Sequence, residues 1–177
     1  MGISITTSNA TADEITITNG VTGLEVKDGG VDAVKTVGVG GSVNLSLFGW
    51  TVDAGTWGFG NGDGYASGVY FSNVGSHAIN DAISTTVYLT AGTYVASFHG
   101  CDGSVFGILD IKIDSVSVDT IDMYSGSGDN KHAFTGSAFV IAESGFKDIQ
   151  LIVDDKNASS SNYHVNIQTD FILTRTV

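Results

Sequence analysis

The feature that most constrains the fold is a strict alternation of apolar and polar side chains near the C-terminus. One alternate set is mostly apolar: Tyr163, Val165, Ile167, Thr169, Phe171 and Leu173. The other is mostly polar: His164, Asn166, Gln168, Asp170, Ile172 and Thr174. Because successive side chains of a strand point to opposite faces, the pattern predicts a half-buried strand.

The segment before it alternates in the same way at Ile149, Leu151 and Val153. The small polar residues 155–161 then form a loop between two strands that we expect to be antiparallel. The chain has 24 glycines and no proline, so Gly, Ser, Thr, Asn and Asp carry the turns. With β-branched residues between the glycines, this composition predicts many short strands with tight connections.

Further strands are expected along the rest of the chain. Asn19-Gly20 marks a hairpin between two short strands, and strands flank both residues 60–64 and Ala91-Gly92. Residues 42–50 form a strand in which Val43, Leu45 and Leu47 alternate with Asn44, Ser46 and Phe48. In another, Leu109, Ile111 and Ile113 face one way and Asp110, Lys112 and Asp114 the other.

Three segments leave their structure open. Residues 31–37 fit a helical turn or a strand, residues 76–84 a short helix or an irregular crossing, and residues 132–143 a strand pair or one bent strand. The chain as a whole contains about eight to eleven short strands at the spacing of an all-β protein. We therefore predict an antiparallel β-sandwich or jelly roll.

A chain of 177 residues is long enough for one ordinary domain with a sizeable core. We expect a jelly-roll β-sandwich domain over residues 38–177, because no change of composition marks a second domain. Residues 1–37 precede a glycine-rich stretch. They are expected either to form an N-terminal arm or to add strands to the same sandwich.

The net charge of −12, from 7 basic and 19 acidic residues, argues against binding to nucleic acids and to anionic membranes. No segment has the apolar length of a membrane span, and no signal peptide is visible. Gly2 and Thr6 match a myristoylation pattern, but without a basic cluster we interpret residues 1–7 as the start of a strand. Cys101 is the only cysteine, so no internal disulfide is expected.

The second half of the chain carries a series of short motifs. They comprise Leu89, Ala91, Gly92, Thr93, Tyr94, Ile111, Ile113, Asp114, Thr120, Ile121, Asp122 and Tyr124. They continue with Gly145, Lys147, Asp148, Ile149, Leu151, Val153, residues 156–161, Tyr163, Leu173, Arg175 and Thr176. These residues resemble the jelly-roll domains of tailed-bacteriophage virion proteins, which occur as tail-fibre heads and as capsid decoration or head-fibre proteins.

The resemblance covers about residues 80–177. The motifs on which it rests are those that form the fold, and none of them is catalytic. It implies a non-enzymatic structural protein of the virion, a capsid decoration or head-fibre subunit that acts as a homotrimer. Its partners would be the major capsid protein or other virion proteins, and no cofactor is expected. The initial Met, the missing export signal and the end directly after the last strand favour a separate subunit. The alternatives are a receptor-binding tail-fibre head that recognises a host glycan, and a carbohydrate-binding module.

The densest aromatic segment supplies the candidate site residues Trp50, Trp57, Phe59, Tyr65 and Tyr70. Exposed aromatic rings near Asn and Asp suit stacking and hydrogen bonding to a sugar. We favour the alternative that these rings belong to a core or a subunit interface, because large aromatic residues dominate both. A glycan binder should present Trp50, Trp57 or Tyr65 to solvent in a groove, whereas a decoration protein should bury them.

His99 and Cys101 would share a face of a strand, which is a spacing open to nucleophilic or metal chemistry. No second pair has metal-ligand spacing, and His77, His132 and His164 lie in unrelated contexts. We therefore interpret Cys101 as a small thiol that is buried or lies at the edge of a loop.

Asn61 and Asp63 alternate with glycine as in a calcium loop, but the terminal bidentate Glu is missing. Other carboxylates expected in loops are Asp102, Asp129, Asp154 and Asp155. We interpret all of these as solvated turn residues and expect no metal. Carboxylates are numerous, but nothing singles out a glycosidase pair, and no common hydrolase or phosphate-binding motif is present.

Overall fold

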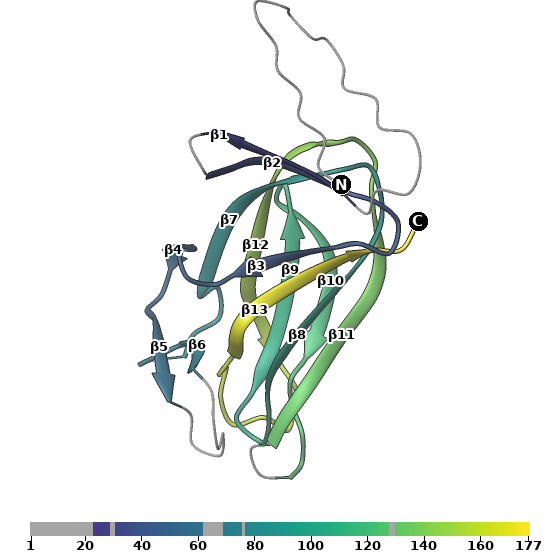
Figure 1. Ribbon diagram of the computed structural model, residues 1–177. Coiled ribbons are helices and arrows are strands. Elements are labelled where there is room, and N and C mark those ends of the chain that lie inside the picture. The colour runs from purple at the N-terminus through teal and green to yellow at the C-terminus, as the bar shows by residue number, and fades with distance from the viewer. Residues whose placement is uncertain (1–22, 29–30, 62–68, 76, 128–129) are drawn as a thin grey trace, which may run out of the picture.

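The computed structural model of the protein describes residues 23–28, 31–61, 69–75, 77–127 and 130–177. Regular structure in these residues consists of thirteen β-strands in three sheets, and every strand pairing is antiparallel (Figure 1). The predicted all-β antiparallel sandwich is therefore confirmed. In the described part of the chain, no helix is long and apolar enough to cross a membrane.

The larger sheet has the strand order β11-β8-β13-β6-β5, and β3 also pairs with β13. Its strands are β3 (Ser42–Ser46), β5 (Trp57–Asn61), β6 (Val69–Asn73), β8 (Gly92–Asp102), β11 (Asn130–Ile141) and β13 (Asn166–Arg175). Strands β11 and β5 are thus at its two ends.

The smaller sheet has the order β10-β9-β12-β7-β4. Its strands are β4 (Thr51–Ala54), β7 (Ala82–Leu89), β9 (Gly107–Ile113), β10 (Val116–Asp122) and β12 (Gly145–Lys156). The two sheets face each other, with β10 and β11 along one side of the sandwich and β4 and β5 along the other (Figure 1).

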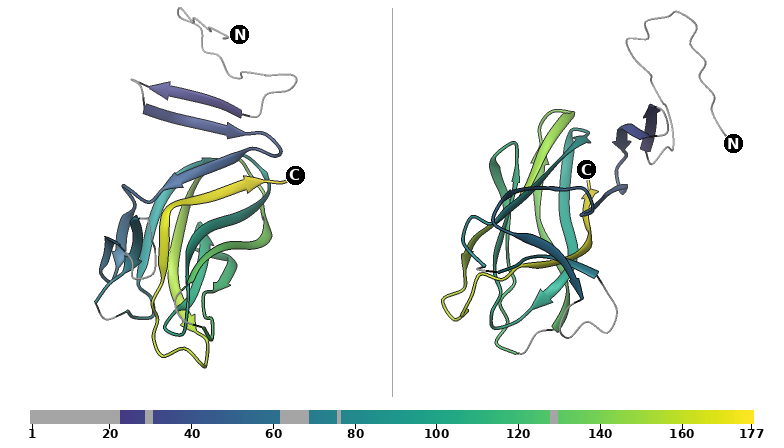
Figure 2. Two further views of the ribbon diagram at one scale, coloured as in Figure 1. Left: turned by 60° about the horizontal axis from the view of Figure 1, so that its bottom comes forward. Right: turned by 90° about the vertical axis from the view of Figure 1, so that its left-hand side faces the viewer.

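The third sheet contains only β1 (Gly23–Asp28) and β2 (Val31–Val37), which pair with each other. Residues 31–37 are therefore a strand. Figure 2 shows this hairpin beside the end of the sandwich. The expected Asn19-Gly20 turn lies outside the described residues, and the division of the chain at residue 37 stays a prediction.

The core lies between the two large sheets and is built from the apolar side of each alternating strand. Ile149, Leu151 and Val153 of β12 are fully buried, as are Ile167, Phe171 and Leu173 of β13. Each such side chain contributes about 1.5–3 kcal/mol relative to an exposed position. The alternation that predicted these strands therefore also identified their core faces.

The strands on either side of residues 157–165 do not lie in the same sheet. We expected an antiparallel pair there, but β12 pairs with β7 and β9, whereas β13 pairs with β3, β6 and β8. Strands β7 and β8, on either side of Ala91, are divided between the sheets in the same way. Alternation identifies the core face of a strand, and two such faces can either share a sheet or meet across the core.

The two remaining open segments are now assigned. Residues 77–81 are an irregular crossing with no helix, and His77 and Asn80 have positive φ angles of 42° and 70°. Residues 130–141 form the single strand β11, bent by a bulge between Thr135 and Ala138.

Two polar residues predicted to face outward are buried. Asn166 is 3% exposed, and its Oδ1 accepts a hydrogen bond from the Cys101 backbone N–H at 3.2 Å. Asp110 is 4% exposed; it accepts a 2.6 Å hydrogen bond from the Ser117 hydroxyl and lies 3.6 Å from the Lys112 ammonium. Nearby donors satisfy both groups, so burial is tolerated.

Candidate functional site

The two tryptophans of the aromatic segment are buried, each only 8% exposed. Trp50 meets Phe171 edge-on at 6.1 Å between ring centroids, and Trp57 packs on Phe71 at 5.6 Å. The Trp57 indole N–H donates to the Ala54 carbonyl at 3.2 Å. Neither tryptophan is therefore presented to solvent as we expected of a glycan binder, because both complete the core, and the third ring of that expectation, Tyr65, lies outside the described residues.

Phe59 is 43% exposed, and its ring stacks on Phe48, which is 60% exposed. The two centroids are 4.4 Å apart and the rings are inclined by 12°. Sequence reasoning missed Phe48 as a site residue, although it belonged to the outward set of its strand. Tyr65 lies outside the described residues, and of Tyr70 only the backbone, in β6, is described.

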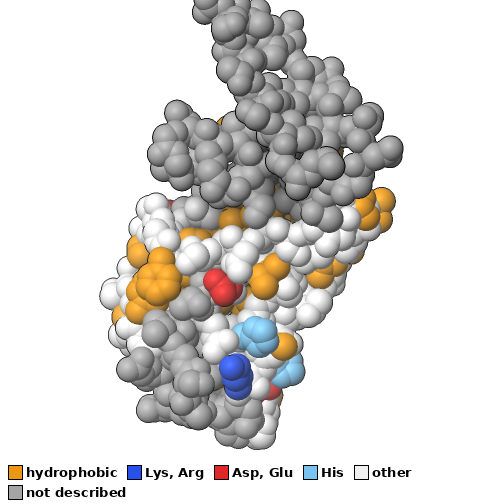
Figure 3. All heavy atoms as spheres, viewed as in Figure 1, with side chains coloured by type: hydrophobic (Ala, Val, Ile, Leu, Met, Phe, Trp, Pro, Cys, Tyr) orange, Lys and Arg blue, Asp and Glu red, His pale blue; other side chains and the backbone are white. Residues whose placement is uncertain are grey.

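Three phenylalanine rings lie in contact one after another from the core to the surface: Phe71, Phe59 and Phe48. We call them the aromatic stack. Phe71 is 5% exposed and lies 4.5 Å from Phe59, which in turn lies against Phe48. In the space-filling view, hydrophobic side chains gather on the side of the molecule where β4 and β5 lie (Figure 3). The outermost ring thus offers an aromatic surface backed by ordered rings.

A tight turn between β3 and β4 carries Phe48 to the surface. Gly49 has a φ angle of 102°, which glycine adopts without steric cost. The Trp50 N–H closes the turn on the Leu47 carbonyl at 3.4 Å. Leu47 and Trp50 point into the core while Phe48 between them is exposed, so the turn itself separates buried from exposed side chains.

The opposite side of the sandwich carries a groove of about 490 Å³ between the edge strands β10 and β11, which we call the edge groove. It is lined by residues 119–122 and 132–137. Its exposed lining residues include Thr120, Asp122, His132, Thr135 and Ser137. Carboxylate, imidazole and hydroxyl groups therefore face an open channel at the sandwich edge.

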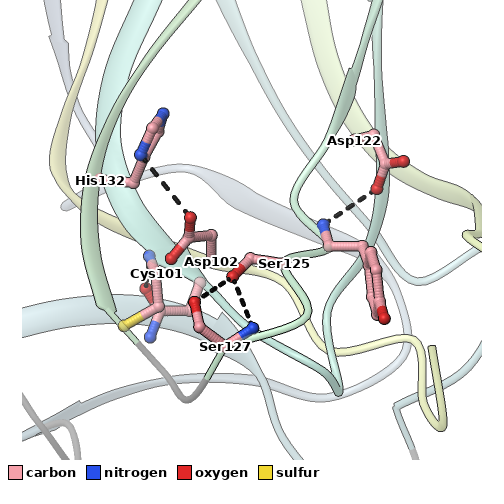
Figure 4. Close-up of polar contacts among 8 residues, drawn as sticks. Cys101, Asp102, Asp122, Ser125, Ser127 and His132 are labelled. Carbon is pink, nitrogen blue, oxygen red and sulfur yellow. Dashed lines mark hydrogen bonds and ion pairs between the residues drawn. The ribbon is translucent and has the colours of Figure 1, made fainter. Parts of the chain in front are cut away.

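Several polar groups of the edge groove are held in place by neighbours. Asp122 accepts hydrogen bonds from the Tyr124 backbone N–H and from the Asn157 amide, both at 2.9 Å. The Nδ1 atom of His132 lies 3.7 Å from the Asp102 carboxylate, and the two side chains point toward one another in Figure 4. The other Asp102 oxygen is buried with no hydrogen-bond partner among the described residues.

His99 and Cys101 do not form a joint site. Cys101 is 3% exposed and belongs to the core, whereas His99 is exposed. The hydrogen bond from the Cys101 backbone to Asn166 ties this end of β8 to the start of β13. The interpretation of Cys101 as a small buried thiol agrees with this burial.

The residues compared with a calcium loop, which we interpreted as solvated turn residues, are described only in part. Asp63 and Asp129 lie outside the described residues, and Asn61 is described only by its backbone in β5. The other three carboxylates belong to strands and not to loops, Asp102 at the end of β8 and the remaining two in β12. Among the described residues, no group of three or more His, Cys, Asp or Glu could hold a metal ion.

Two histidines that the sequence left in unrelated contexts meet in the structure. The ring centroids of His77 and His164 are 4.5 Å apart, and His164 also stacks on Phe106 at 4.8 Å. Burial, reinforced by the charge of His77, lowers the pKa of His164 from 6.5 to about 4. The two residues are far apart in sequence, so no local pattern pointed to the contact.

No family model matches this sequence, and no curated protein matches it either. Solved structures do resemble the fold. A CBM36-1 domain of a multidomain xylanase, from the hindgut metagenome of Trinervitermes trinervoides, matches 75% of this chain and 95% of its own length, with a TM-score of 0.51 and 22% identity. A CBM36 carbohydrate-binding module in complex with calcium and xylotriose matches 73% of this chain and 97% of its own, with a TM-score of 0.52 and 18% identity.

The chain also resembles part of a Paenibacillus xanthan lyase, with a TM-score of 0.58 and 20% identity. That match covers 75% of this chain but only 13% of the lyase. At these identities the likeness establishes the fold alone. The fold is thus one that carbohydrate-binding modules adopt.

Proposed function

We propose that the protein is a non-catalytic carbohydrate-binding domain that holds a saccharide against the aromatic stack. The observation that carries this proposal is the exposure of Phe48: its ring is 60% exposed to solvent and is the outermost of the aromatic stack. Exposure of a large apolar ring to water is unfavourable in free energy, and burial of the ring against a ligand removes this penalty. The apolar C–H face of a pyranose ring matches the flat face of Phe48, and the ordered rings beneath reduce the entropy lost on binding.

The similarity to complete carbohydrate-binding modules supports this assignment. The chain corresponds to nearly the whole length of two such modules and to a small part of a large lyase. This relationship favours a binding module over a complete enzyme. We therefore expect no turnover of any saccharide that the protein binds.

The test is a binding assay on the full chain with xylan, cellulose and mannan, in which Phe48→Ala should weaken binding at least tenfold. The matched control is Phe146→Ala on β12, a phenylalanine 62% exposed that contacts Tyr88 edge-on at 5.5 Å. Binding that is unchanged in Phe48→Ala, or equally weakened in both variants, would contradict the proposal. So would failure of the unaltered chain to bind any of the three polysaccharides.

A second candidate is a virion decoration or fibre subunit that docks on other proteins, as a trimer or on a capsid. It is favoured by the burial of Trp50 and Trp57 and by two valines at an apolar hollow of about 290 Å³. Val116 and Val140 line this hollow and are 65% and 68% exposed. Mass spectrometry of purified virions tests this role: a decoration protein is present in many copies per particle, and its absence from particles excludes the role.

A further inference from the structure

We propose that the edge groove is a second saccharide-binding site, separate from the aromatic stack and selective for neutral over anionic sugars. The inference shares its ligand class with the proposed function and rests on it in that respect. It concerns a different surface and different residues. The two sites can therefore be tested one at a time.

The two surfaces lie on opposite sides of the sandwich. The edge groove runs between β10 and β11, the first strands in the order of their sheets. Phe59 belongs to β5, the last strand of the larger sheet, and Phe48 follows β3. Because the core separates these edges, the groove and the stack form separate subsites. A polysaccharide chain could engage both only by wrapping around the molecule or by bridging two molecules.

The groove presents hydrogen-bonding groups whose positions are already fixed. The Oδ1 atom of Asp122 accepts a hydrogen bond from the Tyr124 backbone N–H, and its Oδ2 atom accepts one from the Asn157 side-chain amide. Each oxygen can accept a further hydrogen bond. Because those neighbours restrict the carboxylate, a sugar hydroxyl that donates to it requires little further ordering. The hydroxyls of Thr120, Thr135 and Ser137 line the same channel.

An imidazole adds a flat surface to these polar groups. The His132 ring lies 4.7 Å from the Phe134 ring at an inclination of 55°, and Phe134 is 7% exposed, so an exposed ring contacts a buried one. The Asp102 carboxylate lies 3.7 Å from the His132 Nδ1 atom, and the two side chains point toward one another in Figure 4. The imidazole ring and the adjacent hydroxyls and carboxylate form the combination that saccharides require, apolar contact beside directed hydrogen bonds.

Charge decides between classes of saccharide. Among the described residues, Asp119 and Asp122 line the groove and no Lys or Arg does so. His132, which also lines the groove, has its Nδ1 atom 3.7 Å from the Asp102 carboxylate. A uronate would bring a carboxylate toward two others, which is unfavourable and sensitive to salt. A neutral oligosaccharide meets no such repulsion.

The experiment is a titration of the full chain, followed by backbone amide chemical shifts, with cellohexaose, xylohexaose, mannohexaose and hexagalacturonate. We expect at least one neutral hexasaccharide to shift the amides of residues 119–122 and 132–137. Hexagalacturonate should bind there at least tenfold more weakly at low salt. Asp122→Asn and Thr135→Val should each weaken the groove response severalfold, whereas Asp154→Asn, an exposed carboxylate on β12, should not.

The outcomes separate the two proposals. In Phe48→Ala the groove response should persist while any response of residues 47–60 is lost. If the groove amides remain unshifted with all four probes, the second site does not exist, whatever the stack binds. Equal binding of hexagalacturonate would overturn the charge selectivity, and loss of the groove response in Phe48→Ala would show that the two surfaces are not independent.

Discussion

At the scale of single residues, a few buried polar side chains connect segments that no local pattern relates. Asn73 is fully buried, and its amide donates to the Asp81 carboxylate and to the Tyr163 carbonyl, both at 3.0 Å. Its carbonyl accepts from the Val165 N–H at 2.8 Å. One side chain thus joins β6, the crossing before β7 and the approach to β13, and its complete hydrogen bonding makes the burial tolerable.

The same region should make stability depend on pH through His164. Its pKa is 6.5 when exposed and about 4 in the folded protein, because burial and the neighbouring His77 disfavour the proton. Between these values the unfolded chain binds more protons, so the free energy of unfolding should fall as pH decreases from 6.5 to 4. The full loss is about 3 kcal/mol and is complete below pH 4.

Urea unfolding at a series of pH values measures this dependence. His164→Phe keeps an aromatic ring against Phe106. Between pH 6.5 and 4, this substitution should reduce the slope of the free energy of unfolding against pH by the equivalent of about one proton. The control is His99→Gln at an exposed position of β8, which should leave the slope unchanged. An identical slope in the original chain and His164→Phe would show that His164 does not titrate with a lowered pKa.

At the scale of strands, a bulge in β11 ties the two sheets together at their shared edge. The bulge covers residues 136 and 137 and leaves the Ser137 N–H outside the β8 pairing, where it donates to Asp119 of β10 at 2.8 Å. A Cβ atom at Gly136 would collide with the Asp119 carboxylate, so an alanine here would force that carboxylate away from the Ser137 N–H. Gly136→Ala should therefore destabilise the protein by about 1–3 kcal/mol and weaken ligand binding in the edge groove.

Chemical denaturation measures the change in stability, and the saccharide titration measures the change in binding at the edge groove. Gly145→Ala is the matched control, because nothing lies within 4 Å of a Cβ atom placed there. It should change stability by less than about 0.5 kcal/mol. A normal stability of Gly136→Ala would mean that the contact between β10 and β11 does not hold the edge together.

Alternation located most strands because it reflects a local physical fact, the burial of one strand face. It could not assign β12 and β13 to different sheets, since the core faces of both are equally apolar. It placed Phe48 in an outward set but gave no reason to prefer it to Trp50, whose burial depends on contact with Phe171. The edge groove was beyond prediction for the same reason, because it joins strands that only the topology brings together.

At the scale of the whole molecule, the sandwich is a rigid frame with different chemistry on its two sides. One core, extending from Val43 to Leu173 through both sheets, supports the aromatic stack on one side and the edge groove on the other. Dense packing makes such a core resist deformation, so each surface keeps its shape without a ligand. This arrangement suits binding by preformed surfaces.

The frame should not need the first 37 residues. β1 and β2 pair only with each other, in a sheet of their own, and β2 also lies near β7 of the sandwich. An isolated two-stranded hairpin is at best marginally stable in water, so it can add little to the sandwich. A chain of residues 38–177 should unfold cooperatively, with a free energy within about 1 kcal/mol of the full chain. Calorimetry of both proteins measures this difference, and a truncated chain without a cooperative transition would show that residues 1–37 belong to the same folding unit.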